Sequence, residues 1–250
     1  MKKSSYPGLI DLGVELDTEK AGAWNGGLFH VNAHYTYGRG TPDDSGSFID
    51  SSSINAYDTL RLYEAWYQHT TWDGRLSVRL GQVALDEEFA TSDLAATLLV
   101  NNFGYSGIVS AFDGHSQFAV AGLAARILLE PRVRAAPGAY LMGAVGEGNP
   151  DGAVDQNGGP LNTTGVRYDF QFGLVAALEA GYRLDPDHGW NGLPGVYKAG
   201  CYVHAAEGRP TPSQAFFGSE VVENQVVYLR ADQWVWTESK EPSQGLALFA

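Results

Sequence analysis

Three side chains that could contact a polyhydroxylated ligand lie on two neighbouring segments of the sequence. Glu64 and Trp66 share one face of the segment Leu60–Thr70, and Arg79 lies on the next segment, Arg75–Val83. A carboxylate and a guanidinium can both hydrogen-bond hydroxyl groups, and an indole can stack on the C–H face of a sugar ring. In a simpler interpretation, Glu64 and Arg79 only pair with each other across the two segments. The sequence leaves both interpretations open, and they are compatible.

Further charged residues on the same faces extend this set. Most of them are expected to be the ordinary polarity of a water-facing wall, with only a few in contact with a ligand. His204 has no serine or cysteine nucleophile placed beside it, so a catalytic role is not indicated. Arg183, Lys198, His204 and Asp232 share the polar face with the candidates. The candidate contact residues are Glu64, Trp66, Arg79, Asp86, Glu88, Arg126, Glu179 and Arg230.

Composition limits the class of function. The chain has 250 residues, a formal net charge of -13 and one cysteine, Cys201. Binding of nucleic-acid phosphates needs a clustered basic surface, so a nucleic-acid partner is disfavoured. One cysteine can form neither an internal disulfide nor a cysteine metal cluster, and neither a cofactor nor a metal is expected. No stretch approaches the roughly 18 consecutive apolar residues of a membrane helix, although membrane-spanning strands stay possible.

Alternation of apolar and polar residues with period two recurs along the chain, which predicts strands whose two faces meet different environments. Every second residue from Ile10 to Leu16 is apolar, and the residues between them are polar or glycine. In the segment around residue 65, the alternation assigns Tyr63 to the apolar face together with Ala65 and Tyr67. Similar patterns predict strands around residues 28–35, 75–80, 117–129, 139–145, 174–183, 197–204, 227–235 and 244–250.

The connections between these segments alternate in length. Thr18–Gly27, Thr71–Gly74 and Glu130–Gly138 are short, whereas Gly38–Thr59 and Ala84–Ser116 are long. A soluble sandwich has no reason to keep this rhythm, but an outer-membrane barrel does, because every second connection is a short periplasmic turn. We therefore expect an all-β, antiparallel, up-and-down transmembrane barrel, with the apolar face toward lipid and the charged face toward a water-filled lumen.

Aromatic residues near the strand ends agree with contact to lipid. Interfacial girdles of tyrosine and tryptophan mark both edges of the apolar band of such barrels. The apolar faces of the predicted strands carry no lysine, arginine or carboxylate. The residues expected in the girdles are Tyr35, Tyr37, Trp72, Tyr182, Trp190 and Trp236.

The long connection Ala84–Ser116 is expected to narrow the pore. Its apolar content should fold onto something, and the lumen is available, so we predict that it narrows the channel. Side chains that can cap a helix, Thr91, Ser92 and Asp93, precede an apolar stretch from Leu94 onward, which predicts a short helix. The alternative is a loop packed across the mouth of the barrel.

Several strings follow one another along the chain: LYEAWYQ at 62–68, DGRLSVRLGQ at 73–82, EEFATSD at 87–93 and NNFG at 101–104, then GLPGVYKAG at 192–200, ADQWVW at 231–236 and QGLALFA at 244–250. Together they resemble the carbohydrate-selective porin family of the OprB type, over essentially the whole chain. The resemblance implies an outer-membrane channel, not an enzyme, for passive diffusion of small carbohydrates. It implies one domain over residues 1–250 in outer-membrane lipid, and leaves a homo-oligomer of the full-length protein open.

The resemblance also implies a barrel of about 16 strands, the size class that leaves an aqueous channel. The alternation predicts only about ten strands, so we expect one strand to precede this chain and about five to follow it. No apolar signal segment follows Met1–Ser5, and export must then depend on a leader outside this sequence. A partial wall with two open edges is unfavourable in lipid, so the chain alone is not expected to insert as a stable monomeric pore.

Two other classes of function compete with a channel. A secreted all-β glycosidase could use Glu15 with Asp17, or Asp86 with Glu88, if the two carboxylates lay about 5–9.5 Å apart across a sugar. A soluble carbohydrate-binding β-sandwich would bury the faces that carry Ile10 and Phe29 in one core. Burial of the apolar face would therefore indicate the sandwich, and exposure of that face would indicate the barrel.

Overall fold

Ten strands form a single antiparallel sheet in sequential order in a computed structural model of the chain. The structure describes residues 6–38, 54, 57–98, 120–150, 162–184, 192–205, 224–238 and 244–250. The strands are β1 (Gly8–Asp17), β2 (Gly27–Tyr37), β3 (Thr59–Thr71), β4 (Leu76–Val83), β5 (Gly122–Leu129), β6 (Ala139–Glu147), β7 (Leu174–Leu184), β8 (Gly195–Ala205), β9 (Asn224–Thr237) and β10 (Gly245–Phe249). Every predicted strand is present.

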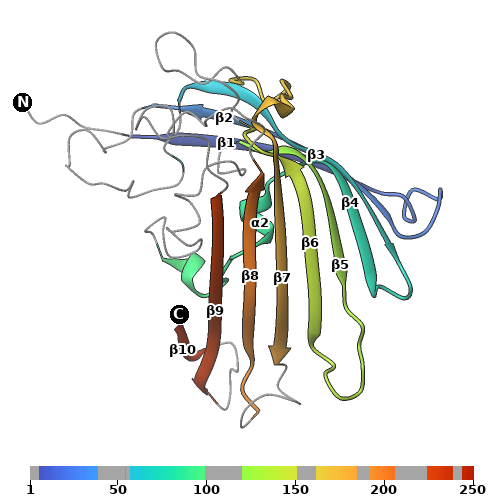
Figure 1. Cartoon of the computed structure of the whole chain (residues 1–250), viewed down its shortest axis with the longest axis vertical. Helices are drawn as coiled ribbons and strands as arrows, with labels where there is room; N and C mark the ends of the chain where they lie inside the picture. Colours follow the sequence, from blue (N-terminus) through green and yellow to red (C-terminus); the bar gives the residue numbers. More distant parts are fainter. Residues whose placement is uncertain are drawn as a thin grey trace, which may run out of the picture.

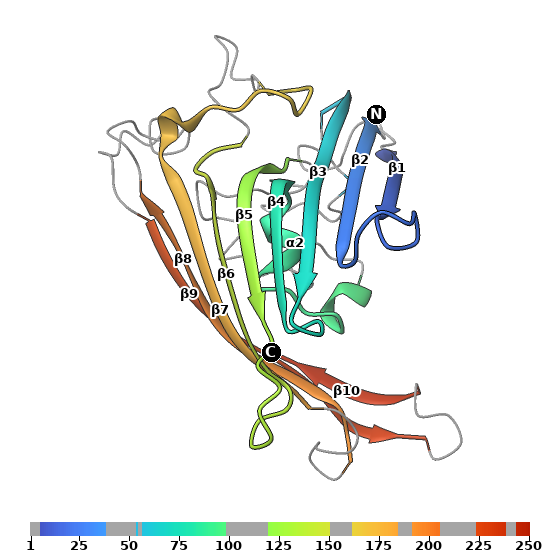
Figure 2. The ribbon, with the colours of Figure 1, turned by 90° about the vertical axis from the view of Figure 1, so that its right-hand side faces the viewer.

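The sheet is a curved wall, and its edges are β1 and β10 (Figures 1 and 2). Among the described residues these two strands do not pair with each other, so the wall is open. The short helix α2 (Leu85–Glu88) lies on the concave side (Figure 1). In the same described ranges, no helix has the length and hydropathy needed to cross a membrane.

The two faces of the sheet differ sharply in exposure. Val14 and Leu229 on the convex face are 72% and 77% exposed, although both are aliphatic. Glu179 and Tyr202 on the concave face are 1% and 0% exposed. No second sheet covers the apolar face in the part of the chain that the structure describes. The apolar side chains therefore lie on the outer, exposed face of the sheet, as predicted. In a sandwich, by contrast, the apolar face would be buried.

One residue was assigned to the wrong face, because β3 contains a β-bulge. The pairing of β2 with β3 passes from Glu64 to Leu62, which leaves Tyr63 as an extra residue in β3. Tyr63 is therefore turned to the concave side and is 2% exposed. The side chain of Gln82 donates to the carbonyl oxygens of Leu62 and Tyr63 at 3.0 and 2.8 Å. These bonds satisfy backbone groups at the bulge that the ladder leaves without a partner.

Four of the predicted girdle residues are exposed: Tyr35, Tyr37, Trp72 and Trp236. Trp72 and Trp236 are 64% and 55% exposed, and Tyr35 and Tyr37 stack on each other with ring centroids 5.5 Å apart. Trp190 lies outside the described residues. Exposed aromatic rings near strand ends agree with an interfacial girdle.

Candidate functional site

After β4 the chain leaves the wall and folds onto its concave side as the segment 84–98, which we call the inner loop. It contains α2 and a single 3-10 turn, η1 (Ala95–Thr97). The hydroxyl of Ser92 accepts a hydrogen bond from the Ala95 N–H at 3.0 Å, but the N-cap of η1 is Leu94, which makes no side-chain capping bond. The helix expected from Leu94 onward is only this one turn, and residues 99–119 of the connection lie outside the described residues.

Three carboxylates of the inner wall, one each on β3, β7 and β9, hold the inner loop at successive points. We call them the carboxylate anchors. The inner loop therefore lies along the wall inside the sheet, not across its mouth. The three contacts are Ala84 N to Glu64 Oε1 at 2.9 Å, Ala90 N to Glu179 Oε2 at 3.1 Å and Ser92 Oγ to Asp232 Oδ1 at 2.6 Å.

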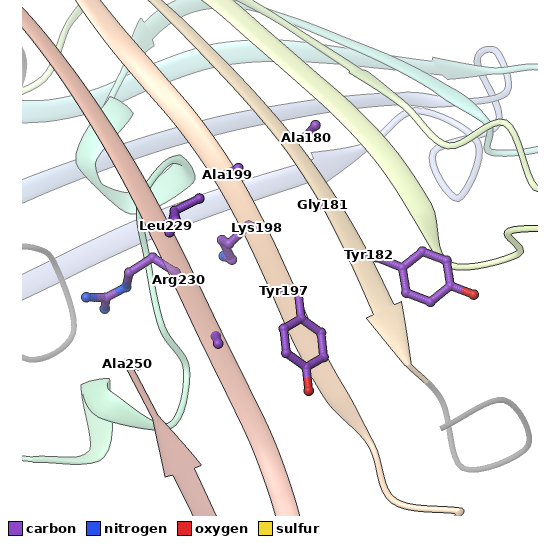
Figure 3. Close-up of a pocket in the computed structure, with 10 residues that line it drawn as sticks. Ala180, Gly181, Tyr182, Tyr197, Lys198, Ala199, Leu229, Arg230 and Ala250 are labelled. Carbon is purple, nitrogen blue, oxygen red and sulfur yellow. The ribbon is translucent and has the colours of Figure 1, made fainter. Parts of the chain in front are cut away.

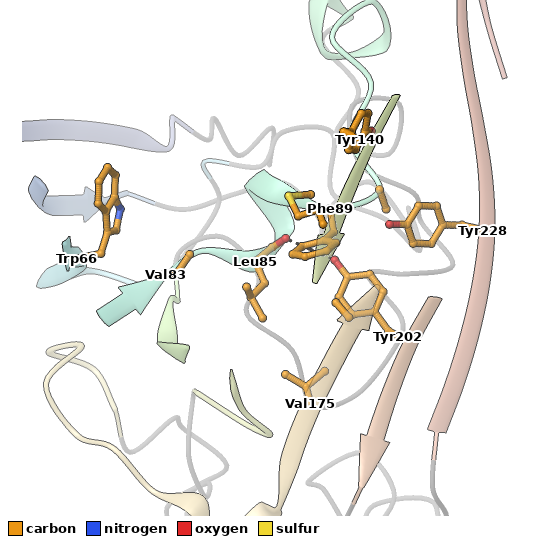
Figure 4. Packing of buried hydrophobic residues seen from close by; sticks show 11 residues of the cluster. Trp66, Val83, Leu85, Phe89, Tyr140, Val175, Tyr202 and Tyr228 are labelled. Atoms are coloured by element: carbon orange, nitrogen blue, oxygen red, sulfur yellow. Dashed lines mark hydrogen bonds between the residues drawn. The ribbon is translucent and has the colours of Figure 1, made fainter. Parts of the chain in front are cut away.

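An apolar cluster fills the space between the inner loop and the wall (Figure 4). Phe89 is fully buried, and its ring packs edge-on against Tyr202 with centroids 6.0 Å apart. Tyr140 and Tyr228, from β6 and β9, are each 6% exposed in the same cluster. Aromatic side chains that point inward are thus used to pack the loop. This cluster could not be predicted from period-two alternation, which only assigns a side.

Next to the inner loop, four polar residues form a compact group, which we call the arginine cluster: Gln68, Arg79, Glu88 and Arg126. Glu88 of α2 forms ion pairs with Arg79 and, at 2.9 Å, with Arg126. The side-chain amide oxygen of Gln68, Oε1, accepts hydrogen bonds from both guanidinium groups, each at 3.0 Å. Arg79 and Arg126 are directly opposite each other on β4 and β5. The cluster therefore brings together three of the candidate residues, and Gln68 is a fourth that was missed.

The ion-pair partner of Arg79 differs from the simple expectation. Sequence reasoning paired Arg79 with Glu64, but its carboxylate partner is Glu88 of the inner loop. Glu64 instead accepts from the loop backbone at Ala84, and its other oxygen lies 3.8 Å from His30 Nε2. The physical reason is that the inner loop supplies its own carboxylate and N–H groups to the wall. Pairing rules for neighbouring strands do not include such a third element.

Trp66 lies between a histidine and an arginine. The ring of His30, on β2, stacks on the indole at 4.7 Å, and the Arg79 guanidinium carbon, on β4, lies 3.8 Å from the centre of the indole ring. Because β2 and β4 flank β3 on opposite sides, these groups cover the two faces of the indole. Trp66 is 7% exposed. A sugar could stack on Trp66 only after displacing His30 or Arg79.

The remaining candidates lie at different depths of the wall and loop. Asp86 is half-buried on α2, and Arg230 is half-buried on β9. Glu179 has both carboxylate oxygens occupied by hydrogen bonds and is 1% exposed, so it is not open to a ligand. Glu87 and Asp93, which sequence reasoning did not single out, are exposed on the inner loop. Their position in the connection that follows β4 was the sequence signal that could have identified them as candidates.

A hollow over β7, β8 and β9 lies away from this site (Figure 3). Ala180, Ala199 and Ala231 line it, and larger side chains such as Tyr197 and Leu229 surround it. These residues belong to the apolar, convex set of their strands, and Leu229 is 77% exposed. The hollow therefore arises where small side chains leave space on the outer face, and it is separate from the arginine cluster.

Comparison with known proteins gives a match over nearly the whole chain. The profile of the family described as "Carbohydrate-selective porin, OprB family" matches residues 2–250. No curated protein matches the sequence.

Two solved structures are similar in fold. The high-pH structure of OprB from Pseudomonas putida superposes with a TM-score of 0.74 at 23% sequence identity, covering 98% of this chain and 59% of the other. The low-pH structure of the same protein gives a TM-score of 0.55 at 17% identity, covering 98% and 58%. The chain thus spans less than two thirds of the length of these structures, which show the fold of the wall.

Proposed function

Because the chain belongs to the carbohydrate-selective porin, OprB, family, we propose that the protein is an outer-membrane channel through which small carbohydrates diffuse. The family consists of outer-membrane porins, which are channels rather than enzymes. On this proposal, lipid contacts the convex face and water fills the space on the concave side. Small sugars are the permeating substrate, and no catalytic step or cofactor is involved.

The observation that carries the proposal is the position of the inner loop inside an outwardly apolar sheet. A loop on the concave side reduces the open cross-section, and the carboxylate anchors keep it there. Narrowing at one level is what allows a water-filled pore to select by size and by hydrogen bonding. We therefore assign the narrow part of the channel to the level of the inner loop.

At that level, the arginine cluster supplies groups that can replace part of the water around a sugar. The side chains of Arg79 and Glu88 are 16% and 14% exposed, which leaves part of each open to the lumen. Guanidinium N–H groups donate to hydroxyl oxygens, and a carboxylate accepts from hydroxyl groups. Since these groups already satisfy one another, exchange with a passing sugar costs little and binding stays weak. Weak binding suits a channel, because tight binding would limit release.

The other candidates take supporting places in this proposal. Glu87 and Asp93 are exposed on the inner loop and can contact a sugar that enters the narrow part. Glu64, Trp66, Arg126 and Glu179 act mainly by holding the loop or the arginines. Asp86 and Arg230 are half-buried and extend the polar lining on α2 and β9.

Since the chain alone is not expected to insert as a pore, the proposal is tested with the full-length protein, by the swelling of lipid vesicles that contain it. Monosaccharides should enter quickly, and entry should slow steeply from mono- to trisaccharides. Replacing Arg79 with alanine should change the relative rates of different sugars more than the conductance for small ions, because it alters the narrow part without opening the wall.

Arg75→Ala is the matched control, because Arg75 is exposed at the short turn before β4. The control should leave both quantities unchanged. Absence of sugar-dependent swelling with the unmodified protein would refute the channel. Equal losses of sugar flux and ion conductance with Arg79→Ala would refute the assignment of the narrow part.

A further inference from the structure

The buried carboxylate of Glu179, in the middle of β7, accepts three hydrogen bonds. Its Oε1 accepts from the Tyr140 hydroxyl at 2.7 Å, and its Oε2 accepts from the Tyr228 hydroxyl at 2.7 Å and from the Ala90 N–H at 3.1 Å. The residue is 1% exposed. These donors come from the adjacent strand β6, from β9, which lies beyond β8, and from the inner loop, so one side chain joins three separate parts of the structure.

Two glycines make room for this arrangement. Tyr140 is directly opposite Gly181, and Tyr228 is directly opposite Gly200. A Cβ atom on Gly181 would lie 2.2 Å from the Tyr140 ring, and one on Gly200 would lie 2.3 Å from the Tyr228 hydroxyl. Each tyrosine therefore lies flat over a glycine of the neighbouring strand and reaches Glu179. The wall is shaped around this carboxylate on both sides.

The point at which Glu179 holds the inner loop is a sharp bend. Ala90 has φ +56°, a backbone conformation that residues with side chains rarely adopt. Phe89 is fully buried against Tyr202. An alanine does not favour this conformation by itself, so the surroundings must impose it. The hydrogen bond from Ala90 to Glu179 and the packing of Phe89 are the contacts that do so.

The bend at Ala90 lies two residues after Glu88, whose carboxylate pairs with both Arg79 and Arg126. Any shift of Ala90 would move Glu88 with it. We propose that Glu179 is a positioning residue: it does not touch the sugar, but it fixes the bend of the inner loop and thereby sets the size of sugar that passes. The effect on sugars rests on the proposed function, whereas the effect on loop position does not.

Limited proteolysis of the protein folded in lipid vesicles tests loop position without any transport. Glu179→Leu removes every acceptor, so a protease that cuts after aromatic residues should cleave at Phe89 about tenfold faster than in the unmodified protein. Glu179→Gln keeps one acceptor oxygen and should give an intermediate rate. Glu19→Leu is the matched control, because Glu19 is exposed in the turn after β1, and it should not change the rate.

Sugar entry into the same vesicles gives the second measurement. The ratio of trisaccharide to monosaccharide entry should rise several-fold in Glu179→Leu, less in Glu179→Gln and not at all in Glu19→Leu. The heat-modifiable gel band of the folded barrel should be retained. If Glu179→Leu fails to fold, the intermediate effects expected of Glu179→Gln still test the proposal.

Three results separate the possibilities. Unchanged cleavage and an unchanged sugar ratio in a folded Glu179 variant would overturn the proposal. Loss of sugar entry in Glu179→Gln as complete as in Glu179→Leu, without cleavage at Phe89, would overturn it in favour of direct sugar contact. Faster cleavage in a protein that passes no sugar at all would support the positioning role and refute the proposed function.

Discussion

Two regions of the concave surface look alike in sequence and differ in structure. On the edge strand β1, which we call the open wall, the side chains of Asp11 and Glu15 are 55% and 61% exposed. Beneath the inner loop, which we call the covered wall, the side chain of Glu64 is 11% exposed and Glu179 is 1% exposed. All four carboxylates follow the same period-two alternation. The inner loop lies over the second region, whereas the first region is an edge strand of the sheet.

The boundary between the two regions passes through one histidine. His30 Nδ1 lies 3.2 Å from Glu15, and its Nε2 lies 3.8 Å from Glu64. Glu15 meets water on its other sides, whereas Glu64 also binds the backbone of Ala84. The comparison teaches that alternation reports the side of the sheet but not access to water. A polar residue on the concave face of such a wall can bind a loop instead of a permeating molecule.

The largest effect is expected where the covered wall concentrates charge. Glu88→Ala leaves Arg79 and Arg126 opposite each other without their shared carboxylate, which should cost about 3–5 kcal/mol of stability, as for other buried pairs that lose one partner. The remaining positive charge should also favour anions in the narrow part. Urea unfolding in vesicles and the reversal potential in a salt gradient measure the two effects.

Glu87→Gln is the neighbouring control for this change. Glu87 accepts one hydrogen bond, from the Tyr63 hydroxyl at 2.8 Å, and an amide oxygen can accept the same bond. Glu87→Gln should therefore change the free energy of unfolding by less than about 1 kcal/mol. A Glu88→Ala protein with unaltered ion selectivity would show that the arginine cluster does not line the permeation path.

A smaller effect is expected from two adjacent residues of β2, next to the open wall, that point in opposite directions. Val31 is 51% exposed on the convex face, and Asn32 donates to Asp11 at 2.7 Å on the concave face. Val31→Lys should cost about 2–4 kcal/mol, because it places a charge in lipid. Asn32→Lys should cost less than about 1 kcal/mol, since its ammonium group can pair with Asp11 in water. Equal costs in urea unfolding would contradict the assigned sides.

The smallest effect is expected on replacing either of the two carboxylates that flank His30. Glu64→Ala should cost about 1–3 kcal/mol, because it leaves the buried N–H of Ala84 without its acceptor. Glu15→Ala should cost less than about 1 kcal/mol, as expected for an exposed ion pair. The difference between the two changes in unfolding free energy measures how much the contact with the inner loop contributes to stability. A larger cost for Glu15→Ala would reverse the comparison.

Much of the wall could be predicted because its physics is local to each strand. Leu178 and Glu179 are neighbours with opposite solvation needs, and strand geometry alone sends them to opposite faces. The apolar content of the connection after β4 predicted that it folds into the lumen, and its described part, residues 84–98, lies on the concave side with Leu85 and Phe89 buried.

The details that determine the site depend on contacts between distant segments. The bulge that turns Tyr63 inward exists because of the register between β2 and β3, which alternation within one segment does not contain. The pairing of Arg79 with Glu88, and the covering of Trp66 by His30 and Arg79, required knowledge of where the inner loop and the neighbouring strands lie. Sequence alone therefore identified suitable residues but not their partners.

The central claim is that the inner loop, lying along the covered wall, sets the width of the path for sugars. Single-channel recording of a protein in which residues 85–98 are replaced by a glycine-serine segment of equal length tests it most directly. The predicted result is a conductance several-fold higher, with mono- and trisaccharides entering at similar rates. A conductance and a sugar ratio equal to those of the unmodified protein would contradict the claim.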